Sequence, residues 1–567
     1  MTQARTDVRT IPTCQVLAED IKALGVGQVY GLMSDDTAVF ATALDSIGVR
    51  FYGARHENNA IAMTEGFATA GGELTVALIG RGPATANGLH AAVLASRTGA
   101  PLLIIYGDQP VPGPALNGLG PDYKGFDGAG VLRAAGLRTF VATSAAAARA
   151  TLADAVSAAR QGGAVALLLP TNVQLAEIPE SEVGARPLPA AADLAPQAPR
   201  PQAIAATAAL LAQSKRPVII GGLGAFKAGA GPMLEQLAER TGALLITSAR
   251  GKDLFRGNPF NLGIIGSFSH SMARRMVDQA DCVLAFGAGL NFLTMSFGAS
   301  VPPVPLVHVD AVRGNIGRWS DADIAVVGDA KLAAEALLQV LPERSVEDKP
   351  FHSAETLGMI ADFDMAQDFQ AANTARTVDP RSLAIELDKL LPENRNLVCD
   401  AGNFLGVVPY ISVPGPGHFK MTNEFASIGL GFGTALGYAK ARPDTTTVLV
   451  IGDGGFLMTM GELETVIRED LPIVIVLMND CAYGAELHFL KARNLPVDKS
   501  VFPDVDYAPI AEAFVFQAHT VRSLDQLRQL APVLANPEGP VFLDCKINAD
   551  VAAPFMHEFA EFEARQH

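Results

Sequence analysis

A glycine- and aspartate-rich turn between two apolar segments constrains this chain more than any other feature. The apolar segment Thr447–Ile451 runs directly into Gly452-Asp453-Gly454-Gly455. The amphipathic stretch Leu457–Arg468 favours a helix, and a second apolar segment, Ile473–Met478, then ends at Asn479-Asp480. This order of strand, turn, helix and strand predicts an open α/β sheet, which binds its ligands at the carboxyl ends of parallel strands.

The acids at both strand ends suit a phosphate ligand that is held through a metal ion. Asp453 and Asp480 lie 27 positions apart. Gly452, Gly454 and Gly455 would let the backbone approach a phosphate, and a helix N-terminus favours its charge. Two carboxylates suit a hard divalent cation. We therefore predict a diphosphate bound through Mg²⁺; a Rossmann-like turn with solvated acids is the alternative.

The composition narrows the class of protein. Of the 567 residues 49% are hydrophobic, which is enough for several buried cores. The net charge of −16 argues against nucleic acid or a membrane surface as a partner. We find no signal peptide over residues 1–12 and no apolar run near the ~20 residues that span a bilayer. Five scattered cysteines without metal-site spacing indicate reduced thiols, so we expect a cytoplasmic protein.

Short apolar runs that alternate with helical patterns indicate buried parallel strands and an α/β fold. The runs are Thr75–Ile79, Leu102–Tyr106, Ala164–Leu169, Val218–Ile220, Val283–Phe286, Val448–Ile451 and Ile473–Met478. The Pro- and Ala-rich stretch Ala185–Gln202 predicts a linker, and a second boundary lies between Leu341 and Pro380, where Glu355–Asn373 could form a helix. We divide the chain into three Rossmann-like domains and a C-terminal tail: 1–185, 200–342, 378–550 and 551–567.

The first and third domains share an internal pattern. Gly80-Arg81-Gly82-Pro83 follows one apolar strand, as Gly452-Asp453-Gly454-Gly455 follows another. The interval from Gly80 to Pro101 is 21 residues, and that from Gly452 to Pro472 is 20. One fold used twice is the simplest explanation, and chance agreement between two α/β units is the alternative.

These features resemble the thiamine-diphosphate enzymes of the acetohydroxyacid synthase and benzaldehyde lyase type. Their signature is Gly-Asp-Gly, followed some two to three dozen residues later by Asn-Asn or Asn-Asp. The resemblance covers Cys14 to Asn548 and implies a pyrimidine-binding first domain, a central domain and a diphosphate-binding third domain. It implies thiamine diphosphate and Mg²⁺ as cofactors, with Asp453, Asp480 and the backbone carbonyl of Ala482 as metal ligands.

The family has Arg-His-Glu where this chain has Arg55-His56-Glu57. The resemblance implies that Glu57 hydrogen-bonds N1′ of the aminopyrimidine. A carboxyl group that shares a proton there stabilises the tautomer that removes the C2 proton, most effectively in an apolar site. The alternative is a glutamate that serves only the dipole of a helix beginning at Glu57.

Further cofactor contacts also follow from the resemblance. Asn403 lies in a loop that touches the diphosphate in relatives, although it would serve equally as a turn residue. Ile428 takes the place of the bulky apolar residue beneath the bent cofactor; taken alone it reads as a core residue. Tyr483 would line the pocket. The predicted cofactor-binding set is Gly402, Asn403, Phe404, Ser427, Ile428, Gly452, Asp453, Gly454, Gly455, Asp480 and Tyr483.

The substrate side departs from the family. The loop 31–36 replaces the usual Gly-Tyr-Pro-Gly-Gly. Asp35 or Asp36 faces the substrate, with capping of the next helix by Asp36-Thr37 as the alternative. Arg81 is a candidate for binding a substrate carboxylate, unless it pairs with an acid. His90 and His488 are candidates for proton transfer, with a structural role as the alternative.

The central domain offers only a weak nucleotide fingerprint. Gly221-Gly222-Leu223-Gly224 ends an apolar strand, but Asp310-Ala311-Val312 replaces the Asp-Ile-Asp that follows the last strand in relatives. Relatives hold FAD or ADP in this domain. For this chain we favour a domain without FAD or ADP.

Together these features predict an enzyme that uses thiamine diphosphate and Mg²⁺ to break or form a carbon–carbon bond next to a carbonyl. We expect a decarboxylase or carboligase, acetolactate synthase-like, that acts on a 2-oxo acid or a hydroxy ketone. The alternatives are a 2-hydroxyacyl-CoA or 2-hydroxyketone lyase, a diketone hydrolase, and a catalytically silent nucleotide-binding protein. A nicotinamide dehydrogenase would need an early Gly-x-Gly-x-x-Gly, which is missing. The resemblance implies a homodimer or homotetramer, with Glu57 of one subunit meeting Asp453 of another.

Overall fold

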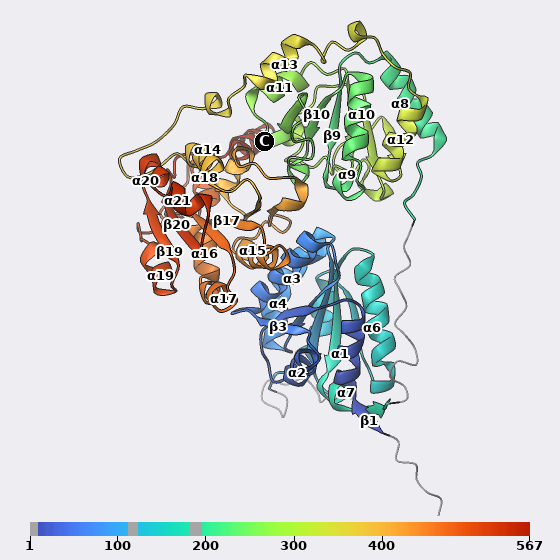
Figure 1. Ribbon diagram of the computed structural model, residues 1–567, viewed down its shortest axis with the longest axis vertical. Helices are drawn as coiled ribbons and strands as arrows, with labels where there is room; N and C mark the ends of the chain where they lie inside the picture. The colour runs from blue at the N-terminus through green and yellow to red at the C-terminus, as the bar shows by residue number, and fades with distance from the viewer. Residues whose placement is uncertain (1–8, 112–122, 181–194, 567) are drawn as a thin grey trace, which may run out of the picture.

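The computed structural model describes residues 9–111, 123–180 and 195–566, and within them the strands form three six-stranded sheets and one two-stranded pair. Every pairing in the three large sheets is parallel (for example β4 with β5, β9 with β12, and β17 with β18). Figure 1 shows the first sheet below, the central one above and the third at the left, each flanked by helices. The predicted α/β class is confirmed, because the predicted apolar runs are buried strands.

The first and third sheets have the same strand order. The first runs β3-β2-β4-β5-β7-β6 and the third β16-β15-β17-β18-β20-β19, which is one sequence when each is numbered from its own first strand. This identity supports the predicted duplication. The strands of the first sheet are β2 Gln28–Gly31, β3 Arg50–Gly53, β4 Thr75–Ile79, β5 Pro101–Asp108, β6 Arg138–Val141 and β7 Gly163–Pro170. Those of the third are β15 Arg395–Cys399, β16 Phe419–Met421, β17 Thr446–Gly452, β18 Ile473–Asn479, β19 Gln517–Val521 and β20 Val541–Lys546.

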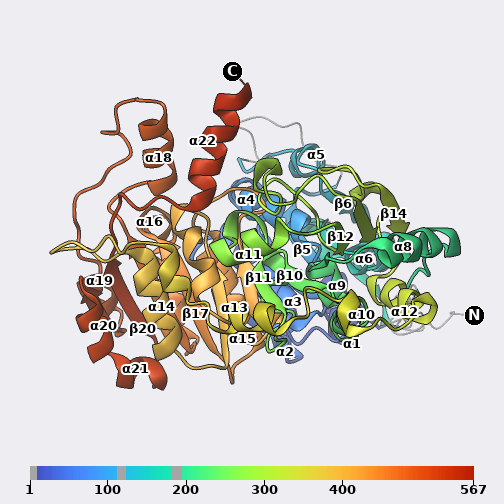
Figure 2. The same ribbon diagram turned by 90° about the horizontal axis from the view of Figure 1, so that it is seen from above.

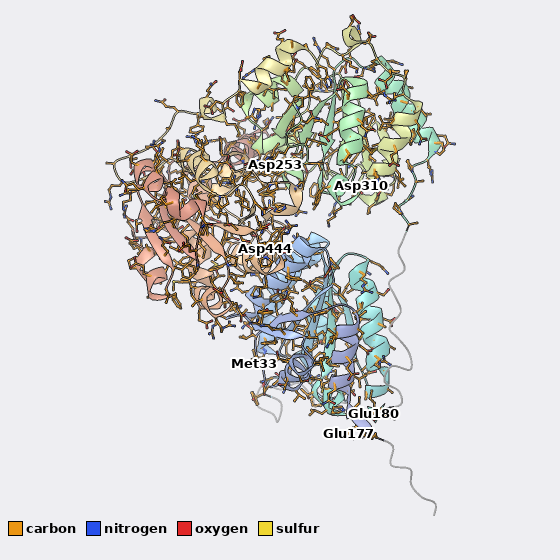
Figure 3. All side chains as sticks on the ribbon, in the orientation of Figure 1. Met33, Glu177, Glu180, Asp253, Asp310 and Asp444 are labelled. Carbon is orange, nitrogen blue, oxygen red and sulfur yellow. The ribbon has the colours of Figure 1, made fainter. Side chains whose placement is uncertain are left out.

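The central sheet has a different order, β11-β10-β9-β12-β13-β14, which is that of dinucleotide-binding folds. Its strands are β9 Pro217–Gly221, β10 Leu244–Thr247, β11 Asn261–Ile264, β12 Cys282–Phe286, β13 Leu306–Asp310 and β14 Ile324–Val327. At the switch point between β9 and β12, the N–H of Gly222 donates to Phe286 O and that of Gly224 to Gly287 O, both at 2.9 Å. These amides of the glycine-rich loop therefore bond to the protein's own backbone. Figure 3 labels Asp310, which ends β13.

The two duplicated domains join through helices α3 (Glu57–Gly71) and α15 (Leu430–Ala441), which lie against each other in Figure 1. A Cβ on Gly66 would lie 2.1 Å from the carbonyl oxygen of Thr434. A Cβ on Gly437 would lie 2.1 Å from that of Met63. Only glycine allows backbones to approach this closely. The two glycines hold nearly equivalent places in the repeat, since Gly66 lies 14 residues before Gly80 and Gly437 lies 15 residues before Gly452.

The remaining helices flank the sheets. Those of the first domain are α1 Thr13–Ala23, α2 Ala38–Ser46, α4 Pro83–Thr98, α5 Gly128–Ala134, α6 Ala145–Arg160 and α7 Thr171–Leu175, and the strands β1 Thr10–Pro12 and β8 Glu177–Pro179 pair antiparallel. The central domain has α8 Pro201–Gln213, α9 Leu223–Lys227, α10 Gly231–Thr241, α11 Ser271–Val277 and α12 Ala330–Val340. The connector has α13 Ala354–Ala361, and the third domain has α14 Pro380–Leu390, α16 Asp453–Thr459, α17 Glu462–Arg468, α18 Gly484–Ala492, α19 Ala508–Ala513, α20 Leu524–Gln529, α21 Ala531–Ala535 and α22 Pro554–Gln566.

Several elements differ from the sequence-based expectation. The helix predicted over Leu457–Arg468 is two helices, because the chain turns at Met460-Gly461 between α16 and α17. The helix considered over Glu355–Asn373 is limited to α13 and one 3₁₀ turn, Met365–Asp368. The tail forms α22, which Figure 2 shows beside α18. Residues 185–194 of the predicted linker lie outside the described residues.

No helix in the described ranges combines the length and apolar character that crossing a membrane needs.

Candidate active site

A cavity of about 470 Å³ opens at the carboxyl ends of β15, β17 and β18. Every residue of the predicted cofactor-binding set except Ser427 lines it. The predicted metal ligand Ala482 lines it too. Parallel strands deliver their carboxyl ends to one edge of the sheet, which explains why three loops far apart in the sequence meet here. The structure thus brings the predicted residues together, and their cofactor contacts stay predictions.

Two neighbouring acids, Asp453 and Asp480, line this cavity. Burial raises the pKa of Asp453 to about 7. The pKa of Asp480 is also raised, by burial and by the neighbouring charge of Asp453. The N–H of Gly454 fixes Asp453 Oδ1 at 3.0 Å, and the N–H of Ala482 fixes Asp480 Oδ1 at 3.1 Å. Two buried carboxylates in contact favour a cation, because it would offset both the burial and the repulsion.

The chemistry of this donor set fits Mg²⁺. Carboxylate and carbonyl oxygens are its usual protein ligands, completed by water and phosphate oxygens. Within the described part of the chain, no three or more His, Cys, Asp or Glu side chains gather as a metal site. A site here would therefore combine Asp453 and Asp480 with a backbone carbonyl, as predicted for Ala482.

The glycines around the acids are required by close packing. A Cβ on Gly454 would lie 2.7 Å from a ring carbon of Tyr483, and one on Gly452 would lie 2.9 Å from the ring of Phe404. A side chain at either position would displace an aromatic ring that lines the cavity. The glycines are therefore needed to keep the lining in its present shape.

Asp400, which the sequence analysis did not single out, positions the loop that leads into α15. It follows β15 and is fully buried. Its Oδ2 accepts from Gly429 N–H at 2.6 Å, and its Oδ1 accepts from Gly431 N–H and from the Thr422 hydroxyl, both at 3.0 Å. Burial raises its pKa to about 6. These bonds hold the segment that presents Ile428 to the cavity. The sequence signal that could have identified Asp400 is its position, because it is an acid directly after an apolar strand.

Asn403 ties the C-terminal tail to the cavity. Its Nδ2 donates to Val551 O at 2.9 Å, and its Oδ1 accepts from Ala553 N–H at 2.8 Å. Helix α22 begins at the next residue and contributes Phe555, Met556 and Phe559 to the lining. The tail therefore forms part of the wall, and a diphosphate contact of Asn403 stays a prediction.

Comparison with known proteins decides the family. Three family models match in chain order: the thiamine pyrophosphate enzyme N-terminal TPP binding domain over residues 13–124, the central domain over 204–337, and the C-terminal TPP binding domain over 400–545. The chain belongs to the thiamine pyrophosphate enzyme family. It is thus an enzyme that depends on thiamine diphosphate. The third match contains the two acids and the glycine-rich turn.

Relatives of this thiamine pyrophosphate enzyme match over nearly their whole length. A probable acetolactate synthase large subunit of Methanocaldococcus jannaschii is 27% identical over 96% of this chain and 93% of its own. A sulfoacetaldehyde acetyltransferase of Castellaniella defragrans is 27% identical over 84% and 83%. The acetolactate synthase isozyme 2 large subunit of Escherichia coli is 24% identical over 94% and 95%.

Glu57 of this thiamine pyrophosphate enzyme lies at the start of α3 and is 8% exposed. Its Oε2 accepts from Asn87 Nδ2 at 3.2 Å. The third domain fixes this end of α3, because Glu462 Oε1 accepts from Arg55 N–H at 2.8 Å and from Asn59 Nδ2 at 2.9 Å. Glu57 does not line the cavity formed by its own chain; the described lining residues all come from Phe268 onward.

The substrate-side candidates pair with each other instead of gathering in the cavity. Arg81 Nε donates to Asp36 Oδ1 at 2.7 Å, and Lys124 Nζ donates to Asp36 Oδ2 at 3.0 Å. Of the two roles considered for Arg81, pairing with an acid is the one observed. Of the capping pair considered, Asp36-Thr37, Thr37 is the N-cap residue of α2, but neither side chain makes a capping hydrogen bond. Neither Asp36 nor Arg81 lines the cavity.

The two histidines also lie outside the cavity lining. His90 Nε2 bonds to the Ser427 hydroxyl and so links the first domain to the loop before Ile428. Burial lowers its pKa. His488 lies on α18, and burial lowers its pKa as well. Proton transfer by either residue stays a prediction.

Proposed function

We propose that this chain breaks or forms a carbon–carbon bond next to a carbonyl, using thiamine diphosphate and Mg²⁺, as a decarboxylase or carboligase. The observation that carries the proposal is the pair of buried carboxylates, Asp453 and Asp480, in a cavity that also contains Ile428. The relatives named acetolactate synthase and acetyltransferase support carbon–carbon chemistry of this kind. A 2-oxo acid or a hydroxy ketone is the proposed substrate.

Each group in the cavity has a part in this proposal. Asp453, Asp480 and the carbonyl of Ala482 would hold Mg²⁺, and the glycine-rich turn would accept the diphosphate. Ile428, held by the bonds of Asp400, would support the cofactor from below. When bound, thiamine diphosphate supplies a carbon nucleophile and an electron sink for the carbonyl carbon. The apolar walls exclude water and strengthen the hydrogen bonds inside.

Glu57 would hold the proton at N1′ of the pyrimidine ring. Since Glu57 is outside the cavity of its own chain, the site would be completed by a second copy. We therefore propose a homodimer, or a homotetramer built from it, in which Glu57 of one subunit meets Asp453 of the other. Mixing the two impaired variants Glu57→Gln and Asp453→Asn under conditions that exchange subunits should raise activity above that of either variant, at a cofactor concentration too low to load Asp453→Asn alone. A mixture of exchanged subunits that is no more active than the separate variants would contradict the shared site.

The test of the function has two steps. Calorimetry should show uptake of thiamine diphosphate that depends on Mg²⁺, and nuclear magnetic resonance in D₂O should show exchange of the C2 hydrogen. A screen of 2-oxo acids and hydroxy ketones should then yield CO₂ or 2-hydroxy ketone products. A protein that takes up no cofactor refutes the proposal. Uptake without C2 exchange would favour the catalytically silent alternative.

A further inference from the structure

The cavity has an aromatic wall, formed by Phe292, Phe297, Phe489 and Phe559, all of which line it. The ring centroids of Phe297 and Phe559 are 5.7 Å apart, and those of Phe489 and Phe559 are 5.2 Å apart. Phe292 and Phe297 come from the loop after β12, Phe489 from α18 and Phe559 from α22. Three separate segments thus converge on one apolar surface.

The loop that supplies half of this wall has a strained backbone. Leu290, Ser296 and Phe297 have φ angles of 48°, 43° and 53°, in the left-handed region that bulky residues avoid. Such strain persists where the surrounding structure enforces it, and it concentrates at functional sites. Phe292 is 48% exposed although it is a large apolar side chain. Together the strain and the exposed ring indicate a surface shaped for an apolar ligand.

The cavity lining offers an anion no cation of its own. Among the described residues that line it, the charged side chains are Asp453 and Asp480, which would hold Mg²⁺, and Glu486; no Lys, Arg or His is among them. Arg81, the cation considered for a substrate carboxylate, is bonded to Asp36 at 2.7 Å. A second anion would therefore meet acids and apolar rings on the part of the wall that this chain supplies.

From this we infer that the carbonyl compound bound at the aromatic wall is uncharged and apolar: an aromatic or longer aliphatic aldehyde, or the 2-hydroxy ketone formed from it. The inference rests on the proposed function. Covering the rings with an apolar group is favourable in proportion to the area removed from water. A carboxylate placed there loses its hydration without gaining a partner. Phe297 and Phe559 are thus specificity-determining residues.

The experiment compares benzaldehyde with its charged para-carboxy derivative, 4-carboxybenzaldehyde, on the full-length protein loaded with thiamine diphosphate and Mg²⁺. Two aldehyde molecules join to one 2-hydroxy ketone with no oxidant or reductant, and chromatography measures the product. We expect kcat/KM for benzaldehyde to be at least about tenfold higher. Equal or better turnover of the carboxylated aldehyde overturns the inference, and so does no turnover of either one.

Variants of the lining residues show which side chains determine the preference for benzaldehyde over 4-carboxybenzaldehyde. Phe297→Gly relieves the left-handed strain but removes the ring that packs against Phe292, Phe559 and Phe562, and the benzaldehyde preference should fall about tenfold. Phe559→Ala should lower the preference similarly. Glu486→Gln removes an acid from the lining and should raise kcat/KM for 4-carboxybenzaldehyde several-fold. Phe226→Ala, on α9 away from the cavity, is the matched control and should keep the preference.

The results separate this inference from the proposed function. A protein that takes up no cofactor and shows no C2 exchange refutes the function itself. A protein that exchanges the C2 hydrogen but does not favour benzaldehyde refutes only the inference. If Phe297→Gly and Phe559→Ala are folded and both keep the full preference, the aromatic wall does not select the substrate.

Discussion

The first and third domains share one strand order but carry opposite charges at the same turn. After β4 the first domain has Gly80-Arg81-Gly82, and after β17 the third has Gly452-Asp453-Gly454. Arg81 pairs with Asp36 at 2.7 Å, whereas Asp453 lies beside a second acid, Asp480. The charge of the Arg81 turn is neutralised within the protein. The Asp453 turn instead has two acids whose charge a cation can neutralise. The fold supplies the place, and single residues decide what it binds.

A second difference concerns the loop after the first strand of each sheet. In the third domain, β15 is followed by the buried Asp400, which fixes the Gly429 loop at 2.6 Å. In the first domain β2 is followed by Leu32 and by Met33, which is 56% exposed and labelled in Figure 3. Both domains thus have a buried acid near this point, but Asp400 binds backbone amides, whereas Asp36 of the first domain pairs with Arg81 and Lys124. The four predictions below test these differences.

The largest effect should come from the acid that the first domain contributes. Glu57→Gln should lower turnover by about 10²–10⁴-fold, the usual contribution of a positioned proton-transfer group. Uptake of thiamine diphosphate should persist, because the diphosphate end lies in the third domain. Steady-state kinetics and calorimetry on one preparation check both parts. The exposed first-domain Glu73→Gln is the control, and equal losses in the two variants would argue against a specific role.

Asp400 should make the stability of the third domain depend on pH in the absence of cofactor. Its pKa is raised from 3.8 to about 6, so the folded state holds a proton that the unfolded state releases. The associated stability is present below about pH 4 and is lost as pH rises through about 6. Between pH 4 and 7 this amounts to roughly 2–2.5 kcal/mol.

Asp400→Asn removes the ionisation, so the stability advantage of the native protein over the variant should shrink by that amount from pH 4 to 7. Denaturant unfolding at pH 4.5, 5.5 and 7 measures the difference. A constant difference across this range would show that Asp400 titrates normally.

Asp453→Asn should weaken Mg²⁺-dependent uptake of thiamine diphosphate by about 10–100-fold, because one charged ligand becomes neutral. Calorimetry across a series of Mg²⁺ concentrations measures the loss. The matched change in the third domain is Asp470→Asn, an acid in the turn before β18 that does not line the cavity. If Asp470→Asn weakened uptake as strongly, the pair of buried acids would not be the metal site.

Local pattern predicted the elements, and the duplicated spacing predicted the repeated fold. The local pattern could not reveal that α16 and α17 are separate helices, because the spacing of apolar residues continues across Gly461 and only the backbone turns there. The predicted cofactor-binding residues other than Ser427 line one cavity because they follow neighbouring strands, while their contacts with the cofactor, which the family resemblance implies, stay predictions. The exception, Ser427, instead bonds to His90 of another domain, a contact that no local spacing encodes.

The residues that were missed act over long sequence separations. The aromatic wall joins Phe297 to Phe559, and each residue alone reads as an ordinary apolar side chain. Asp36 and Arg81 were both noticed, but their pairing depends on two loops meeting at one sheet edge. A single sequence identifies chemistry that is concentrated in a motif, and it leaves out surfaces that only the tertiary fold assembles.

The smallest expected effect tests the contact between the equivalent helices α3 and α15 of the first and third domains. Gly66→Ala and Gly437→Ala each place a Cβ 2.1 Å from a backbone oxygen of the facing helix. Each should lower the free energy of unfolding by about 1–2 kcal/mol, the overpacking cost less the helix propensity that alanine restores. Gly71→Ala, on the same α3 with no heavy atom within 4 Å of the added Cβ, should instead stabilise the protein slightly.

The double variant Gly66→Ala/Gly437→Ala distinguishes a shared contact from two local clashes. One small separation of α3 and α15 relieves both contacts, so the double variant should cost less than the sum of the single ones. Denaturant unfolding of all four proteins measures the coupling. Strict additivity would mean that each glycine is needed by its own domain alone, and that the crossing of the equivalent helices is not one contact.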